Sequence, residues 1–126
     1  MKRLLFLALA AALSATPAFA QHHHGSQTGP NGGTIYEMAD TYHVEVVAKG
    51  TALDIYLSDH DDKAVSAAGF QGVAILVVDG KSVRVTLAPA GANRLTGTST
   101  VALPQRPRGA VQLTPPGRRM IQAQVR

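Results

Sequence analysis

The strongest constraint on the fold is a period-two alternation of polar and apolar residues, repeated in short runs between turn signals. Residues 43–47 and residues 53–58 both alternate in this way. A period of two puts one face of an extended strand inside and the other outside. Gly50-Thr51 separates the two runs, so the pair is predicted to form a β-hairpin.

A second hairpin is predicted around Asp79-Gly80, a pair of residues that favours a two-residue turn. Residues 73–78 before it are nearly all apolar, as in a strand buried on both faces. Residues 82–88 after it alternate again, with Val83, Val85 and Leu87 on one face.

The last third of the chain continues the pattern of short strands and breaks. Residues 89–93 form a turn region, and residues 95–103 are predicted as a Thr-rich strand or strand pair. Residues 104–108 interrupt the pattern, and residues 111–113 and 120–125 make a last pair of strands. No convincing helix follows residue 20. About seven to eight short strands with a turn every eight to twelve residues predict an all-β fold, an antiparallel β-sandwich (Ig-like), with a small β-barrel as the alternative.

The N-terminus has the order of a secretory signal peptide. Lys2 and Arg3 precede a run of about ten apolar residues, and Ala18-Phe19-Ala20 gives a small-x-small cleavage site. The apolar run is shorter than the roughly 20 residues that span a bilayer as a helix, although an uncleaved anchor is the alternative. We therefore predict a signal peptide over residues 1–20, a flexible arm over 21–33, a β-sandwich domain over 34–126 and a periplasmic or secreted location, with no stable membrane insertion after cleavage.

The charged residues are divided between the two halves of the chain. All eight acidic residues lie between Glu37 and Asp79, and eight basic residues with no acid follow Gly80. The basic residues are spaced apart in an exported chain, so we expect no nucleic-acid partner. Pairing between the halves, or docking to an acidic partner through Arg106, Arg108, Arg118 and Arg119, is the expected use of this asymmetry.

The residues with metal-binding chemistry are the histidines, because neutral imidazole suits zinc, copper and nickel. All five lie in the first half: His22, His23, His24, His43 and His60. His43 and Glu45 are two apart on a predicted strand, so their side chains share a face about 6–7 Å apart, and both are expected to point outward. His60 lies in an Asp-rich loop that either binds a metal or turns the chain. The alternatives are a solvated linker for His22–His24 and a plain exposed strand face for His43 and Glu45.

Catalytic motifs have little support. There is no cysteine nucleophile and no Gly-x-Ser-x-Gly elbow, and His43-Val44-Glu45 lacks the second histidine of the metalloprotease helix motif. We expect that the protein is not an enzyme and carries no organic cofactor.

Several segments together resemble a known domain. They are Pro30-Asn31-Gly32-Gly33, Tyr42-His43-Val44-Glu45-Val46-Val47, Ile55-Tyr56-Leu57-Ser58-Asp59-His60-Asp61 and Pro89-Ala90-Gly91-Ala92-Asn93-Arg94-Leu95. The chain resembles the small periplasmic β domain that extends the N-terminus of periplasmic adaptor (membrane-fusion) subunits of heavy-metal efflux pumps and also occurs as stand-alone secreted proteins. In that family histidine often precedes the Gly-Gly pair, where Asn31 stands here.

The resemblance implies a periplasmic β-sandwich linked to metal handling. The sequence-based hypothesis is therefore a metal-binding or metal-chaperone module for copper, zinc or nickel, with metal-efflux pump components or other envelope proteins as partners. The predicted ligands are His22, His23, His24, His43, Glu45 and His60. The alternative is a ligand-free structural or protein-interaction domain of the cell envelope.

Overall fold

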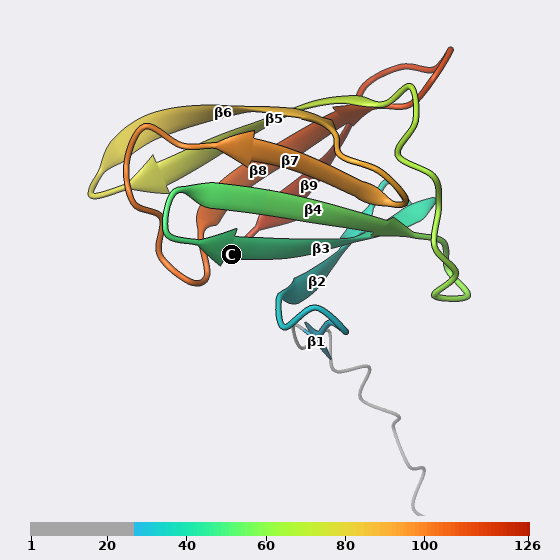
Figure 1. The fold of residues 1–126 in the computed structure, drawn as a ribbon, viewed down its shortest axis with the longest axis horizontal. Coiled ribbons are helices and arrows are strands. Elements are labelled where there is room, and N and C mark those ends of the chain that lie inside the picture. The colour runs from blue at the N-terminus through green and yellow to red at the C-terminus, as the bar shows by residue number, and fades with distance from the viewer. Residues whose placement is uncertain (1–26) are drawn as a thin grey trace, which may run out of the picture.

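The computed structural model describes residues 27–126, which form nine β-strands and no helix (Figure 1). The strands are β1 Gln27–Thr28, β2 Thr34–Met38, β3 Tyr42–Lys49, β4 Ala52–Ser58, β5 Gln71–Val78, β6 Lys81–Pro89, β7 Arg94–Thr98, β8 Arg108–Thr114 and β9 Ile121–Val125. The prediction of an all-β fold is confirmed. Nine strands replace the expected seven to eight, and the predicted signal peptide lies outside the described residues.

All nine strands belong to one antiparallel sheet in the order β1-β2-β3-β4-β7-β6-β5-β8-β9. The sheet curls into a half-barrel, in which the edge strand β9 comes back to β2 (Figure 1). At this seam the Tyr36 hydroxyl donates to the carbonyl of Arg126 at 2.9 Å and accepts from its N–H at 3.4 Å. The strands thus form a single continuous curled sheet, between the two-layer sandwich and the small barrel that the sequence predicts.

The two predicted hairpin turns set the register of the sheet. Asp79 and Gly80 both have positive φ, at 50° and 75°, as a type I′ turn requires, and β5 pairs with β6 directly across them. Gly50 has φ 60° and closes the β3–β4 hairpin, so Lys49 pairs with Ala52 and His43 with Ser58. Both turns lie where the sequence predicts them.

The core lies inside the curl and is almost entirely aliphatic. Alternate residues of the strands are buried, including Val44, Ile55, Leu76, Val85 and Val111 at 0% exposure. Two long connections contribute to the core: residues 59–70 bury Phe70, and residues 99–107 bury Leu103. With no cysteine in the chain, this apolar surface is the main source of stability.

One expectation about strand positions is wrong. Residues 95–103 were expected to be extended pairing strand, but β7 ends at Thr98, and Leu103 N–H instead donates to the Gly50 carbonyl at 2.8 Å as part of the connection. The described part of the predicted arm, residues 27–33, contains β1 and a tight turn that pack on the sheet. The reason is a contact with Glu45 that is described below.

Candidate functional site

The structure brings His43 and His60 together at one end of the sheet. His43 lies on β3 opposite Ser58, and His60 follows two residues after Ser58, so the hairpin register places them side by side. Their ring centroids are 5.4 Å apart and the rings are nearly perpendicular, with an interplanar angle of 85°. Of the predicted ligands, these two form the one close pair within residues 27–126.

Each imidazole is held through one of its nitrogens. His43 Nδ1 lies 3.1 Å from Asp62 Oδ1, and His60 Nε2 contacts the backbone carbonyl of Asp40. Because a carboxylate and a carbonyl accept hydrogen bonds, each of these ring nitrogens carries the proton in the neutral tautomer. The lone pairs are then on His43 Nε2 and His60 Nδ1.

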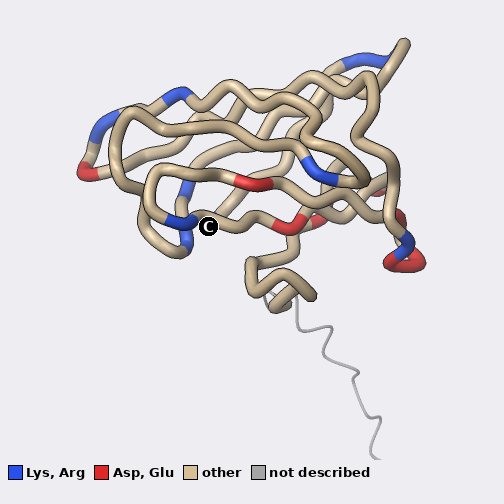
Figure 2. The backbone as a smooth tube through the Cα atoms, viewed as in Figure 1, with Lys and Arg blue, Asp and Glu red and all other residues tan. Residues whose placement is uncertain are grey.

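Two short turns position the partners of these rings. In the loop after β4, Asp59 carboxylate accepts hydrogen bonds from the N–H groups of Asp61 and Lys63 at 2.9 and 3.0 Å, which fixes the loop that carries His60 and Asp62. In the turn between β2 and β3, Ala39 and Asp40 have φ values of 52° and 53°, a region that non-glycine residues rarely adopt. Figure 2 shows the acidic residues of the loop after β4 at this end of the sheet. Asp59 thus has a structural role, while Asp62 faces a histidine.

Glu45 does not join the histidine pair. It was expected on an exposed face with His43, yet it is only 3% exposed because the turn between β1 and β2 covers it. Its Oε2 accepts from the N–H groups of Asn31 and Gly33, both at 2.9 Å, and its Oε1 accepts from Asn31 Nδ2 at 3.0 Å. The Glu45 carboxylate therefore latches the turn onto β3 and is not directed at a metal.

Within residues 27–126 there is no cluster of three or more His, Cys, Asp or Glu side chains arranged to hold a metal ion. The predicted ligands His22, His23 and His24 lie outside the described residues.

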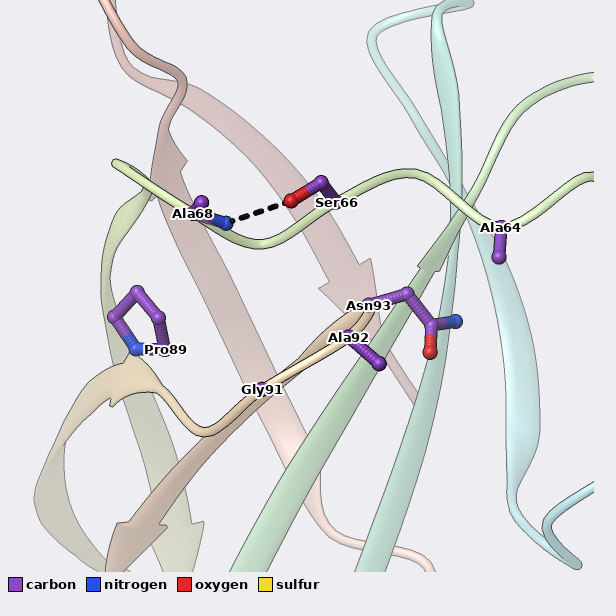
Figure 3. Close-up of a pocket in the computed structure, with 7 residues that line it drawn as sticks. All are labelled: Ala64, Ser66, Ala68, Pro89, Gly91, Ala92 and Asn93. Atoms are coloured by element: carbon purple, nitrogen blue, oxygen red, sulfur yellow. Dashed lines mark hydrogen bonds between the residues drawn. The ribbon is translucent and has the colours of Figure 1, made fainter.

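A separate pocket of about 340 Å³ lies between the loop after β4 and the turn between β6 and β7 (Figure 3). Its wall consists of small residues: Ala64, Ser66, Ala68, Pro89, Gly91, Ala92 and Asn93. Asn93, which sequence reasoning did not single out as functional, joins these elements by donating from Nδ2 to the Leu57 carbonyl at 2.9 Å. The wall has no ionisable side chain, so the pocket offers no acid, base or strong metal ligand.

The four arginines expected to form one docking face are divided between two places. Arg106 and Arg108 lie at the start of β8, whereas Arg118 and Arg119 lie beyond its end, in the turn before β9. The seven residues of β8 span about 20 Å at roughly 3.3 Å per residue. These residues do not make a single basic patch.

Comparison of the chain with protein-family models, with curated proteins and with solved structures finds no match. Residues 27–126 contain no helix long and apolar enough to cross a membrane.

Proposed function

We propose that this protein is an exported metal-binding module that takes a copper, zinc or nickel ion through His43 and His60. The observation that carries the proposal is the histidine pair with ring centroids 5.4 Å apart. Two imidazoles that share one ion through bonds of about 2.0–2.1 Å have their ring centres about 5 Å apart. The separation therefore fits a common ion with little movement of β3 or of the loop after β4.

The hydrogen bonds of the pair support this function. Histidines that bind metals usually donate their second ring N–H to a carboxylate or a backbone carbonyl, which fixes the tautomer and the ring orientation. His43 has Asp62 in that role at 3.1 Å, and His60 has the Asp40 carbonyl. Each ring is thus left with one lone-pair nitrogen for an ion.

Two imidazoles leave a four-coordinate ion incomplete. Water or further side chains must supply the remaining ligands, and His22, His23 and His24 are the other histidines of the sequence. A site with two fixed ligands and others recruited from a terminal segment favours an ion that is bound weakly and exchanged, as in a carrier. The resemblance to adaptor domains of heavy-metal efflux pumps points to the same role.

The test is calorimetric titration of the purified protein with Cu(II), Zn(II) and Ni(II) in the presence of a weak competing chelator. We expect saturable binding of one ion, and we expect His43→Gln and His60→Gln each to weaken it by about tenfold or more. Asp62→Asn should weaken it by a smaller factor, up to about tenfold, through loss of ring orientation. The matched control is Asp61→Asn, which removes a charge from the same loop without touching either ring and should bind as the wild type does.

A triple variant of His22, His23 and His24 to serine separates the two parts of the site. If it weakens binding and His43→Gln weakens it further, both parts contribute ligands. If the serine variant abolishes binding and the His43 and His60 variants bind normally, the site described here is refuted. Absence of saturable binding by the wild type would refute the function altogether.

A further inference from the structure

A hollow of about 300 Å³ lies on the outer face of the sheet, well separated in the topology from the histidine pair. It crosses the interior strand β5 between its neighbours β6 and β8. Arg84 on β6 pairs with Ile75, Gln112 on β8 pairs with Val73, and Thr114 pairs with Gln71. Because alternate residues share a face, these side chains all project outward. The full lining is Gln71, Gly72, Val73, Arg84, Gln112, Thr114 and Met120.

The polar lining of the hollow is rich in hydrogen-bond donors and has no acidic side chain. Among the described residues, Arg84 forms no ion pair and no side-chain hydrogen bond. The Gln112 amide is oriented by a hydrogen bond from its Nε2 to Gln122 Oε1 at 3.0 Å, and one amide hydrogen remains to donate. A guanidinium with free amide and hydroxyl donors beside it suits a carboxylate, which arginine binds through two parallel N–H···O bonds.

The other part of the lining is apolar. Met120 is 52% exposed, one of the few large apolar side chains on the surface of the described chain, and Val73 lies across from it in the same hollow. The thioether of methionine adapts to irregular apolar shapes. A volume of about 300 Å³ is at the lower end for small-molecule sites, so it suits one short apolar group next to one anionic group.

We propose that this hollow binds a carboxylate attached to a short apolar group. Arg84 pairs with the carboxylate, and Val73 and Met120 pack against the apolar group. Such a group occurs in free small carboxylic acids and at the C-terminus of a peptide that ends in an aliphatic residue. The site is separate from the metal ion proposed above, because its lining lies on β5, β6 and β8 and just before β9, whereas His43 lies on β3 and His60 in the loop after β4.

The test is a ¹H–¹⁵N NMR titration of the purified protein with N-acetyl-leucine, and with N-acetyl-leucinamide as the uncharged match. We expect saturable shifts of the Gln71, Val73 and Thr114 amides with the acid, and binding of the amide weaker by about tenfold or more, since the charge-assisted hydrogen bonds are lost. Arg84→Gln should remove the preference for the acid. The control is Arg108→Gln, which removes an arginine from the same face of the sheet, opposite Val77 and outside the hollow, and should keep that preference.

Met120→Ala should weaken the binding of acid and amide alike, because it removes the apolar wall and leaves the guanidinium. A short peptide ending in leucine, tested beside its C-terminal amide, shows which kind of molecule supplies the carboxylate. Tighter binding of the peptide acid than of N-acetyl-leucine assigns the site to chain termini. Equal binding of the two assigns it to small carboxylates. Equal binding of N-acetyl-leucine and its amide would overturn the proposal. So would equal losses in Arg84→Gln and Arg108→Gln, which would show attraction by net charge alone.

Discussion

At the scale of single residues, the buried carboxylate of Glu45 explains why the segment before β2 is part of the fold. Glu45 accepts hydrogen bonds from two backbone N–H groups, those of Asn31 and Gly33, and from the Asn31 side chain. A side chain on Gly29 would overlap the Glu45 carboxyl group. The Gly29–Gly33 turn is therefore shaped around one acidic residue on β3.

Glu45→Ala is expected to lower the free energy of unfolding by about 2–3 kcal/mol. The change leaves two backbone N–H groups without acceptors under a covered turn, and a buried donor without a partner costs about 1–3 kcal/mol. Urea unfolding followed by circular dichroism measures the loss. Glu37→Ala, an exposed acid on β2, is the control and should change stability by less than about 0.5 kcal/mol. Equal effects of the two substitutions would contradict the role of the Glu45 carboxylate in holding the turn between β1 and β2.

The sequence could predict part of the candidate site at this scale. Once Gly50-Thr51 is taken as a two-residue turn, the register puts His43 opposite Ser58, so the closeness of His60 follows from counting residues. The role of Glu45 could not be found in this way. Strand period shows which face a side chain is on, but not that a turn twelve to fourteen residues earlier covers that face.

At the scale of strands and turns, the apolar patterns and the turn residues predicted the positions of β3, β4, β5 and β6. The expectation that residues 73–78 are buried on both faces is wrong, because Val77 on β5 is 54% exposed. The apolar patterns also failed for residues 99–103, where the large apolar residues Val101 and Leu103 are two apart, as they would be on one face of a strand. Leu103 is buried at the end of the curl, while Val101 is 41% exposed. Apolar residues two apart occur in connections as well as in strands, and only the pairing partners distinguish the two.

At the corner between β6 and β7, Gly97 on β7 lies very close to β6, and this predicts that a side chain at Gly97 destabilises the fold. The two strands pair only at Ala88–Thr96 and Pro89–Leu95. Beyond this point, a Cβ atom on Gly97 would overlap the Thr86 carbonyl and come within 2.7 Å of Val85 Cγ1. Gly97→Ala is therefore expected to cost about 3 kcal/mol, the upper end for overpacking. Thermal and urea unfolding check it, with Thr98→Ala on the same strand as the control at less than about 1 kcal/mol. A Gly97→Ala protein as stable as the wild type would show that the backbone at this corner moves at little cost to make room for the added methyl group.

At the scale of the whole molecule, the strand order explains how one sheet encloses a core. β2, β3 and β4 follow one another, β7 returns to pair with β4, and β8 and β9 extend the other side from β5. The twist of sheets with this many strands favours curling, and the curl brings β9 toward β2. Sequence reasoning could not choose this arrangement over two separate layers, because both bury the same alternate residues.

The seam between β2 and β9 has no ladder of backbone hydrogen bonds, so Tyr36 and Arg126 carry much of its polar contact among the described residues. Tyr36→Phe keeps the ring and removes the hydroxyl, and we expect it to lower the free energy of unfolding by about 1 kcal/mol, the net value of a typical hydrogen bond. Because the lost contact is local to an edge strand, amide hydrogen exchange in β9 should become faster, while exchange in the interior strands β5 and β6 should change only as much as global stability does. Tyr56→Phe is the matched control, since Tyr56 on β4 forms no side-chain hydrogen bond within the described chain, and it should leave both measurements unchanged. If Tyr36→Phe and Tyr56→Phe gave the same exchange rates in β9, apolar packing inside the curl would be sufficient to hold the seam, and the hydroxyl would have no part in keeping the half-barrel curled.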